Sequence, residues 1–306
     1  MRSWDWDPTV ISMIALSVGL YLTGWWRIKR HSSSHSVLPT WRLWCFLLGL
    51  ATIWVALLSP IGVYDDLFFF IHMIQHLLLM LLAAPLLLLG APLLPMLWAF
   101  PRDIRVGVGR LFAPGLIHTV FSTLTHPAVA VTLYCLVESV WHIPRFYDAA
   151  QGRTLTHNLE HAIFLGAALL FWWPVIHPAG GRRRLSYAAG VVYFLPPMLV
   201  GTLIGALLTF APRPLYSYYE HVPRVWGISV LQDQQLAGLI MWVPGGLAFL
   251  VPVFVFLVLV LSESPPDEPT VSGGDEEVDG AKSWSGQDCA AETSDHSETA
   301  NGLTRE

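Results

Sequence analysis

The chain has 306 residues, of which 54% are hydrophobic and 13% are charged, and its mean hydropathy is +0.53. A water-soluble domain of this length needs far more charge to cover its surface, so the composition excludes one and predicts an all-α, polytopic membrane helix bundle. The formal net charge of −5 is an average, because residues 262–306 hold 12 of the 22 acidic residues and two basic ones, whereas residues 1–261 carry a net +5.

Seven apolar segments, each long enough to cross about 30 Å of hydrocarbon, follow one another along the chain. We predict membrane-spanning helices at residues 9–26, 41–59, 67–90, 126–143, 157–177, 187–210 and 235–261. The first segment follows WDWD at residues 4–7 rather than a basic stretch, so we predict a retained helix and not a signal peptide. The predicted domains are a seven-helix transmembrane domain over 1–261 and a disordered, acidic tail over 262–306.

Basic residues are distributed unevenly between the two sides of this arrangement. The loops after the first, third and fifth helices carry ten of them, and the opposite side carries five. Because basic loops stay in the cytoplasm, we predict that the amino terminus is outside and that the acidic tail is cytoplasmic. Between the third and fourth helices, apolar and basic residues alternate over 102–112, which predicts a helix lying on the membrane surface.

The third predicted helix begins with two histidines one turn apart, His72 and His76, with Gln75 between them. A spacing of four residues places both imidazoles on one helix face, where they can offer two ligands to one metal ion. Met80 lies one turn further along that face, and Met198 lies in the sixth helix. Thioethers favour Cu(I), but methionines in membrane helices are more often packing residues.

The fourth and fifth predicted helices carry similar pairs. Glu138 and His142 are four residues apart at the end of the fourth helix, and His157 and His161 open the fifth with Glu160 between them. In the predicted orientation, all of them reach the same outer level as the pair in the third helix. A single histidine at this depth would be explained as an interfacial anchor. Several at a common depth predict a polar, metal-binding site, because ionisable groups in a membrane usually face a bundle interior.

The sixth and seventh predicted helices complete the surroundings of this site. Pro196 and Pro197 remove two backbone donors from the sixth helix, which predicts a kink or break beside a cavity. Asp233 and Gln234 give the seventh helix a polar start on the outer side. The three cysteines are far apart and form no CxxC motif, so neither a disulfide framework nor a thiolate clamp is predicted.

Three motifs, in this order along the chain, resemble a known family. They are HMIQHLLLMLLAAPLLLLGAP, WHIPRFYDAA followed by HNLEHAIFLGAALLFWWPV, and DQQLAGLIMWVPGG. Together with the seven spans they cover residues 4–261 and are similar to the multi-pass bacterial cytochrome c oxidase assembly factor CtaG family. The positions that this resemblance marks are His72, Gln75, His76, Trp141, His142, Pro144, Tyr147, His157, Glu160, His161, Asp233, Gln234 and Gln235.

The resemblance implies a non-enzymatic, multi-pass protein of the bacterial plasma membrane that is needed to form active haem–copper oxidase. It implies copper as the metal, and as partners the oxidase subunits, membrane lipid and a copper donor protein. The predicted copper ligands are His72, His76, His142, His157 and His161. The predicted supporting polar shell is Gln75, Glu138, Glu160, Asp233 and Gln234.

Two other classes of function remain compatible with the same residues. A membrane redox protein could hold haem between facing histidines, although haem ligands normally lie deeper than a helix end. A metal-ion transporter could use the proline-containing sixth helix, although the inner half of the bundle offers few polar residues. A retinal-binding protein is excluded because the only lysines, Lys29 and Lys282, lie outside the spans. The sequence shows no nucleophile elbow, phosphate-binding loop or nucleic-acid patch.

Overall fold

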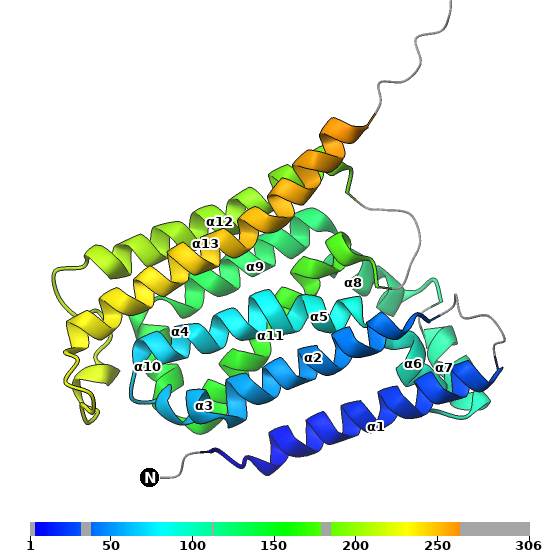
Figure 1. Cartoon of the computed structure of the whole chain (residues 1–306), viewed down its shortest axis with the longest axis horizontal. Coiled ribbons are helices and arrows are strands. Elements are labelled where there is room, and N and C mark those ends of the chain that lie inside the picture. Colours follow the sequence, from blue (N-terminus) through cyan, green and yellow to red (C-terminus); the bar gives the residue numbers. More distant parts are fainter. Residues whose placement is uncertain (1–3, 32–37, 112, 179–184, 264–306) are drawn as a thin grey trace, which may run out of the picture. The chain divides into compact units, whose positions relative to one another are not determined.

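The structure, a computed structural model, describes residues 4–31, 38–111, 113–178 and 185–263 of the chain. These residues form helices and connecting segments with no strand among them, which confirms the predicted all-α class. Six helices are long and apolar enough to cross a membrane, or seven if a bent pair is counted as one span (Figure 1). The chain is therefore a multi-pass membrane protein. The predicted tail lies outside the described residues from residue 264 onward.

The predicted spans correspond to helices that are regular except in the third and fourth. The elements up to residue 124 are α1 (Pro8–His31), α2 (Thr40–Leu58), α3 (Pro60–Tyr64), α4 (Phe69–Leu77), the π-helix η1 (Leu78–Ala83), α5 (Ala84–Leu89), α6 (Leu93–Trp98), α7 (Arg102–Leu111) and α8 (Leu116–Leu124). The later elements are α9 (Pro127–Trp141), α10 (Pro144–Gln151), α11 (Thr154–Ile176), α12 (Tyr187–Phe210), the 3-10 helix η2 (Tyr218–Glu220) and α13 (Val230–Ser262).

The third span lies between α2 and α11 and changes its helix type along its length. It passes from α4 through η1 into α5, whose second residue is Pro85. Proline has no backbone N–H and clashes with the carbonyl four residues earlier, so the helix widens ahead of it. In the wide turn Ala84 donates to the carbonyl of Leu79. The carbonyl of Met80, which would face the missing N–H of Pro85, accepts a hydrogen bond from the Trp172 indole at 3.0 Å instead.

The fourth predicted span is shorter and more bent than expected. α9 has 15 residues, and α8 meets it at an angle of 66°. Pro127 is the first residue of α9, and His126 before it has extended backbone, as a residue preceding proline prefers. This pair of helices is one broken span or a re-entrant segment. The helix predicted over 102–112 is present as α7, and Phe112 lies outside the described residues.

α12 and α13 run side by side along their length (Figure 1). Their backbones meet at two glycines: a Cβ atom at Gly205 would lie 2.9 Å from the carbonyl oxygen of Gly238, and one at Gly238 would lie 2.5 Å from that of Gly205. Small residues allow membrane helices to approach this closely. α12 is continuous through Pro196 and Pro197, so the sixth helix is not broken there, and Pro197 borders a cavity.

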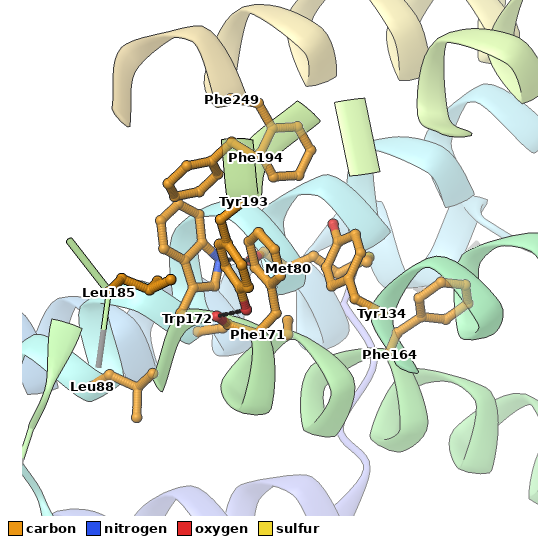
Figure 2. Packing of buried hydrophobic residues seen from close by; sticks show 12 residues of the cluster. Met80, Leu88, Tyr134, Phe164, Phe171, Trp172, Leu185, Tyr193, Phe194 and Phe249 are labelled. Carbon is orange, nitrogen blue, oxygen red and sulfur yellow. Dashed lines mark hydrogen bonds between the residues drawn. The ribbon is translucent and has the colours of Figure 1, made fainter. Parts of the chain in front are cut away.

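An aromatic core joins α11 to the α12–α13 pair. Figure 2 shows Phe171 and Trp172 of α11 packed with Tyr193 and Phe194 of α12 and with Phe249 of α13. The rings of Phe171 and Tyr193 stack with centroids 4.9 Å apart, and the Tyr193 hydroxyl donates to the Phe171 carbonyl at 2.7 Å. This core fixes the position of α11, which carries two of the predicted metal ligands.

Candidate metal centre

Four of the five predicted histidine ligands meet between two helices. His72 and His76 come from α4, and His157 and His161 come from the beginning of α11. Within each helix the two ring centroids are 4.2 Å and 4.5 Å apart, respectively. Across the helices, His72 lies 5.2 Å from His157, and His76 lies 5.3 Å from His161. The four-residue spacing therefore places each pair on one helix face, and the packing of α4 on α11 turns the two faces toward each other.

Acidic side chains join these imidazoles in two sets whose potential ligand atoms all lie within 4.8 Å of one another. One set is Asp65, His72, His157 and His161, and the other is His72, His76 and Glu160. Metal–nitrogen bonds of 2.0–2.1 Å would place neighbouring ligand atoms of a tetrahedral site roughly 3.4 Å apart. Side-chain movements of about 1 Å would therefore close either set around one ion. We call these six residues the histidine chamber.

The histidine chamber contains buried polar atoms for which the described residues supply no hydrogen-bond partner. They include both ring nitrogens of His76, Nε2 of His161 and both carboxylate oxygens of Glu160. The side chains of His72 and Glu160 have no exposed surface, and their nearest atoms, Nε2 and Oε1, are 3.9 Å apart. A buried polar atom without a partner is destabilising. A metal ion would supply the missing interactions, so the chemistry of this site fits one.

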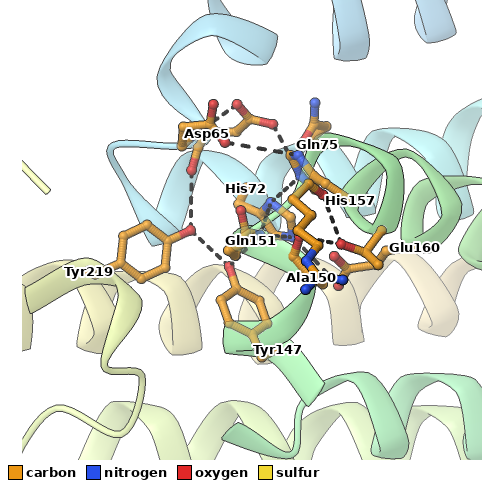
Figure 3. Close-up of polar contacts among 12 residues, drawn as sticks. Asp65, His72, Gln75, Tyr147, Ala150, Gln151, His157, Glu160 and Tyr219 are labelled. Atoms are coloured by element: carbon orange, nitrogen blue, oxygen red, sulfur yellow. Dashed lines mark hydrogen bonds and ion pairs between the residues drawn. The ribbon is translucent and has the colours of Figure 1, made fainter. Parts of the chain in front are cut away.

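A polar network that the sequence did not predict surrounds His72 and His157 (Figure 3). Asp65 Oδ2 lies 3.6 Å from His157 Nε2, and Gln151 Nε2 lies 3.2 Å from His72 Nδ1. The hydroxyl groups of Tyr147 and Tyr219 are 2.8 Å apart, and Tyr219 donates to the carbonyl of Asp65. Burial, and secondly the neighbouring Asp66, raise the pKa of the Asp65 carboxyl well above its usual range. An incoming cation would favour its charged form.

Sequence analysis did not predict Asp65 or Gln151 as part of the site, and the sequence contains only weak indications of their positions. Asp65 lies seven residues before His72, and the short turn between α3 and α4 returns it to the histidines. Gln151 lies four residues after Tyr147, on the same face of α10, so the Tyr147 motif position pointed indirectly to it. In each case the missing information was how a short helix packs.

The predicted shell residues Gln75 and Glu138 occupy different places. Gln75 is buried and donates through Nε2 to the carbonyl of Ala56, which fixes α4 to α2 beside the chamber. Glu138 and His142 lie together at the end of α9, where His142 Nδ1 is 2.6 Å from the Glu138 carbonyl oxygen. They line a separate cavity with His76, and His142 belongs to neither of the two ligand sets of the chamber. The prediction that His142 binds the same ion therefore gains no geometric support.

Asp233 and Gln234 hold backbone groups in place. The two carboxylate oxygens of Asp233 accept hydrogen bonds from the backbone N–H groups of Phe69 and Phe70 at 3.1 and 3.0 Å, and Arg224 pairs with the same carboxylate at 2.8 Å. A carboxylate at this position satisfies free N–H groups at the beginning of α4 and complements its dipole. Gln234 accepts from the backbone N–H of Leu215 at 2.6 Å. Both residues act on the scaffold that positions the chamber.

A groove of about 800 Å³ reaches the histidine chamber, three of whose residues, Asp65, His157 and His161, line it. It is bordered by the first half of α1, by α2 and by the beginning of α11. The second half of α1 is fixed elsewhere, because Tyr21 donates to the carbonyl of Gly90 and Arg27 donates to that of Ala99. The groove is lined by apolar side chains and by the acidic residues Asp5, Asp7, Asp65 and Asp66, together with His157 and His161.

Comparison with known proteins connects this arrangement to one family. A family described as the cytochrome c oxidase caa3 assembly factor, Caa3_CtaG, matches residues 19–263. Uncharacterized proteins of Mycobacterium bovis and Mycobacterium tuberculosis are each 27% identical over 281 residues, which is 90% of this chain and 42% of theirs. An uncharacterized protein of Mycobacterium leprae is 26% identical over 265 residues, 85% of this chain and 39% of its own length. The chain thus spans about two fifths of these curated relatives. No solved structure matches it.

Proposed function

The chain belongs to the cytochrome c oxidase caa3 assembly factor family, and from this premise we propose that it binds copper in the histidine chamber and passes it to the oxidase. An assembly factor acts on cytochrome c oxidase, so the metal required is one that the oxidase contains. In this proposal the chain carries copper as cargo and catalyses no reaction. Binding and release are ligand exchanges at the imidazoles.

The observation that carries the proposal is the set of buried and unpartnered ligand atoms between α4 and α11. Imidazole nitrogens suit copper, and the Glu160 and Asp65 carboxylates offset the charge of a bound cation. No cysteine belongs to either ligand set among the described residues. Imidazoles hold Cu(I) less tightly than thiolates, so the ion can be transferred. Imidazoles must also be deprotonated to bind, so acidification should release the metal.

We further propose that the histidine chamber lies near the outer face of the bacterial plasma membrane. The excess of basic residues in the loops remote from the chamber supports this orientation. A copper donor protein outside the membrane would then reach the chamber through the groove of about 800 Å³, whose acidic residues attract cations. Membrane lipid would border the remaining, apolar length of the groove.

The alternative of a haem held between facing histidines is disfavoured by geometry. His157 Nε2 lies 3.4 Å from His72 Nδ1, close enough for a direct hydrogen bond. Two axial ligands of one haem must lie on opposite faces of the macrocycle, and these two rings leave no room for it between them. Absorbance spectra of the purified protein would reveal haem if this assignment were wrong.

Copper stoichiometry of the purified full chain tests the proposal. We expect bound copper in the wild type and a loss of at least one ion in the His76→Ala/His161→Ala double variant. His221→Ala is the matched control, because His221 is exposed in the loop before α13 and belongs to neither ligand set. Equal copper content in all three proteins would refute binding in the chamber. Oxidase activity in a strain lacking the gene, complemented with each variant, then tests delivery.

A further inference from the structure

A second space lies beside the histidine chamber. This cavity measures about 30 Å³ and is bounded by α4, η1, α9, α11, α12 and α13. Four of the seven methionines of the chain line it: Met73, Met80, Met198 and Met241. They come from three different spans and border the same cavity. We call this space the methionine cavity.

Three ionisable residues that line the methionine cavity have buried polar atoms without partners among the described residues. Glu138 is 7% exposed, and its Oε2 atom has no hydrogen-bond partner among the described residues. The same holds for Nε2 of His142 and for both ring nitrogens of His76. Gly201 faces Glu138 so closely that a Cβ atom there would lie 3.0 Å from Oε1. A buried carboxylate without a partner is costly in an apolar surrounding unless a cation accompanies it.

His76 belongs to both spaces. It is a member of the ligand set with His72 and Glu160, and it also lines the methionine cavity. Met73 precedes it by three residues and Met80 follows it by four, which places all three on one side of the third span. The π-helix η1 begins just after His76, and π-helical turns frequently occur at functional sites. A ligand leaving the chamber through His76 would therefore arrive among thioethers.

We propose that the methionine cavity is a second copper site, specific for Cu(I), which exchanges its ion with the histidine chamber through His76. Thioethers are soft ligands that favour Cu(I) over harder cations. A volume of about 30 Å³ holds one small ion or water molecule and excludes any organic cofactor. Glu138 balances the single positive charge, so the bound state is neutral. The ion stays Cu(I) throughout, so the step needs no oxidant or reductant.

This inference rests on the proposed copper function. The two can be tested separately, because copper bound by nitrogen and copper bound by sulfur are distinguishable. The simplest competing explanation is packing, because buried methionines fill irregular gaps in apolar cores. Methionine and leucine have similar volumes, so a packing role would survive replacement by leucine. A ligand role would not survive, because leucine has no donor atom. The two explanations therefore differ in metal binding and not in stability.

The test is anaerobic titration of the purified full chain with Cu(I) against a chelator, followed by X-ray absorption of the loaded protein. We expect a copper–sulfur shell in the wild type. A variant with Met73, Met80, Met198 and Met241 all changed to leucine should bind one ion fewer and lose that shell. The control is Met96→Leu, since Met96 lines neither the cavity nor the groove. It should match the wild type.

Two results would overturn the inference: a wild type without sulfur ligation, or a fourfold variant with unchanged copper content and spectrum. The wild-type spectrum needs no variant, so a folding failure of the fourfold variant does not remove the test. His72→Ala/His157→Ala separates the two sites. It should lose nitrogen-bound copper and keep the sulfur-bound ion. If the wild type bound copper through sulfur but not through nitrogen, copper binding in the histidine chamber would be refuted. Copper binding in the methionine cavity would still be supported.

Discussion

The α12–α13 pair and the α4–α11 pair both pack two helices within the same bundle, but they do so in opposite ways. α12 and α13 approach through glycines and apolar side chains. α4 and α11 meet through imidazoles and a carboxylate whose atoms lack partners among the described residues. Apolar packing stabilises without a ligand, whereas unpartnered buried polar groups leave free energy to be gained on binding. We therefore propose that the first pair acts as scaffold and the second as a binding site.

The largest effect should come from disturbing the scaffold pair. Gly238→Val places a branched side chain against the Gly205 carbonyl and against Thr209, so the helices must separate. We expect a loss of about 3 kcal/mol or more in the free energy of unfolding, measured by denaturant titration in detergent. Gly166→Ala on α11 is the control, because a Cβ atom there meets nothing within 4 Å. If both variants were equally stable, the close glycine contact would not hold the bundle.

Copper should stabilise the protein through the α4–α11 pair, where the histidine chamber lies. At a free copper concentration about 100 times the Kd, the wild type should gain about 2.7 kcal/mol. His76→Leu/His161→Leu should gain nothing from binding in the chamber. Without metal, its stability should equal or exceed that of the wild type, because two unpartnered polar groups are removed. Thermal unfolding with and without copper measures both effects. A large loss of metal-free stability in the double variant would show that the histidines are structural.

A smaller loss of stability should follow from changing Asp233, which connects α13 to the beginning of α4. Asp233→Asn on α13 leaves one acceptor for the two N–H groups at the beginning of α4 and removes the charge that pairs with Arg224. We expect a loss of about 2 kcal/mol in unfolding free energy and weaker copper binding at His72, one turn further along α4. Asp103→Asn in exposed α7 is the control for loss of a negative charge. An unchanged copper affinity would mean that the beginning of α4 is held by other contacts.

The smallest loss of stability should follow from removing the Trp172 indole, which donates a hydrogen bond to the Met80 carbonyl in the wide turn of the third span. Trp172→Phe leaves the Met80 carbonyl without its hydrogen bond, at a cost of about 1 kcal/mol. Trp242→Phe is the matched control, because the Trp242 indole nitrogen has no hydrogen-bond partner among the described residues. Unfolding free energies of the two variants give the comparison. Equal losses would assign the effect to side-chain volume.

The sequence predicted the spans and the meeting of the histidines for clear physical reasons. Hydropathy identifies a segment that crosses a membrane, and a spacing of four residues fixes which side chains share a helix face. His72, His76, His157 and His161 depend only on these two rules and on α4 packing against α11. The sequence could not place Asp65 or Gln151, because each reaches the chamber through a short helix whose packing has no periodic signal.

Asp233 shows a different limit of sequence analysis. Its polar character at the beginning of the seventh span was visible, but its partners, Phe69 and Phe70, lie 164 and 163 residues away. Asp233 was predicted to support the metal ligands, and in the structure it accepts hydrogen bonds from the backbone of α4. The third span gives a similar example, because the Trp172 side chain that donates to the Met80 carbonyl lies 92 residues beyond it in the sequence. Long-range pairings of this kind are properties of the folded bundle.

The wide turn at Leu78–Ala83 has a consequence for the alignment of the third span. It takes up one residue more than an α-helical turn would, so the segments on either side of it keep their facing although the sequence between them is one residue longer. Deleting one residue of the turn would let it become α-helical and would leave both the imidazoles and the far end of the span against their neighbours. The same deletion within the regular part of α4 or α5 would rotate one end of the span by roughly 100° relative to the other. The wide turn is therefore a place where this span can lose a residue and keep the register between its two ends.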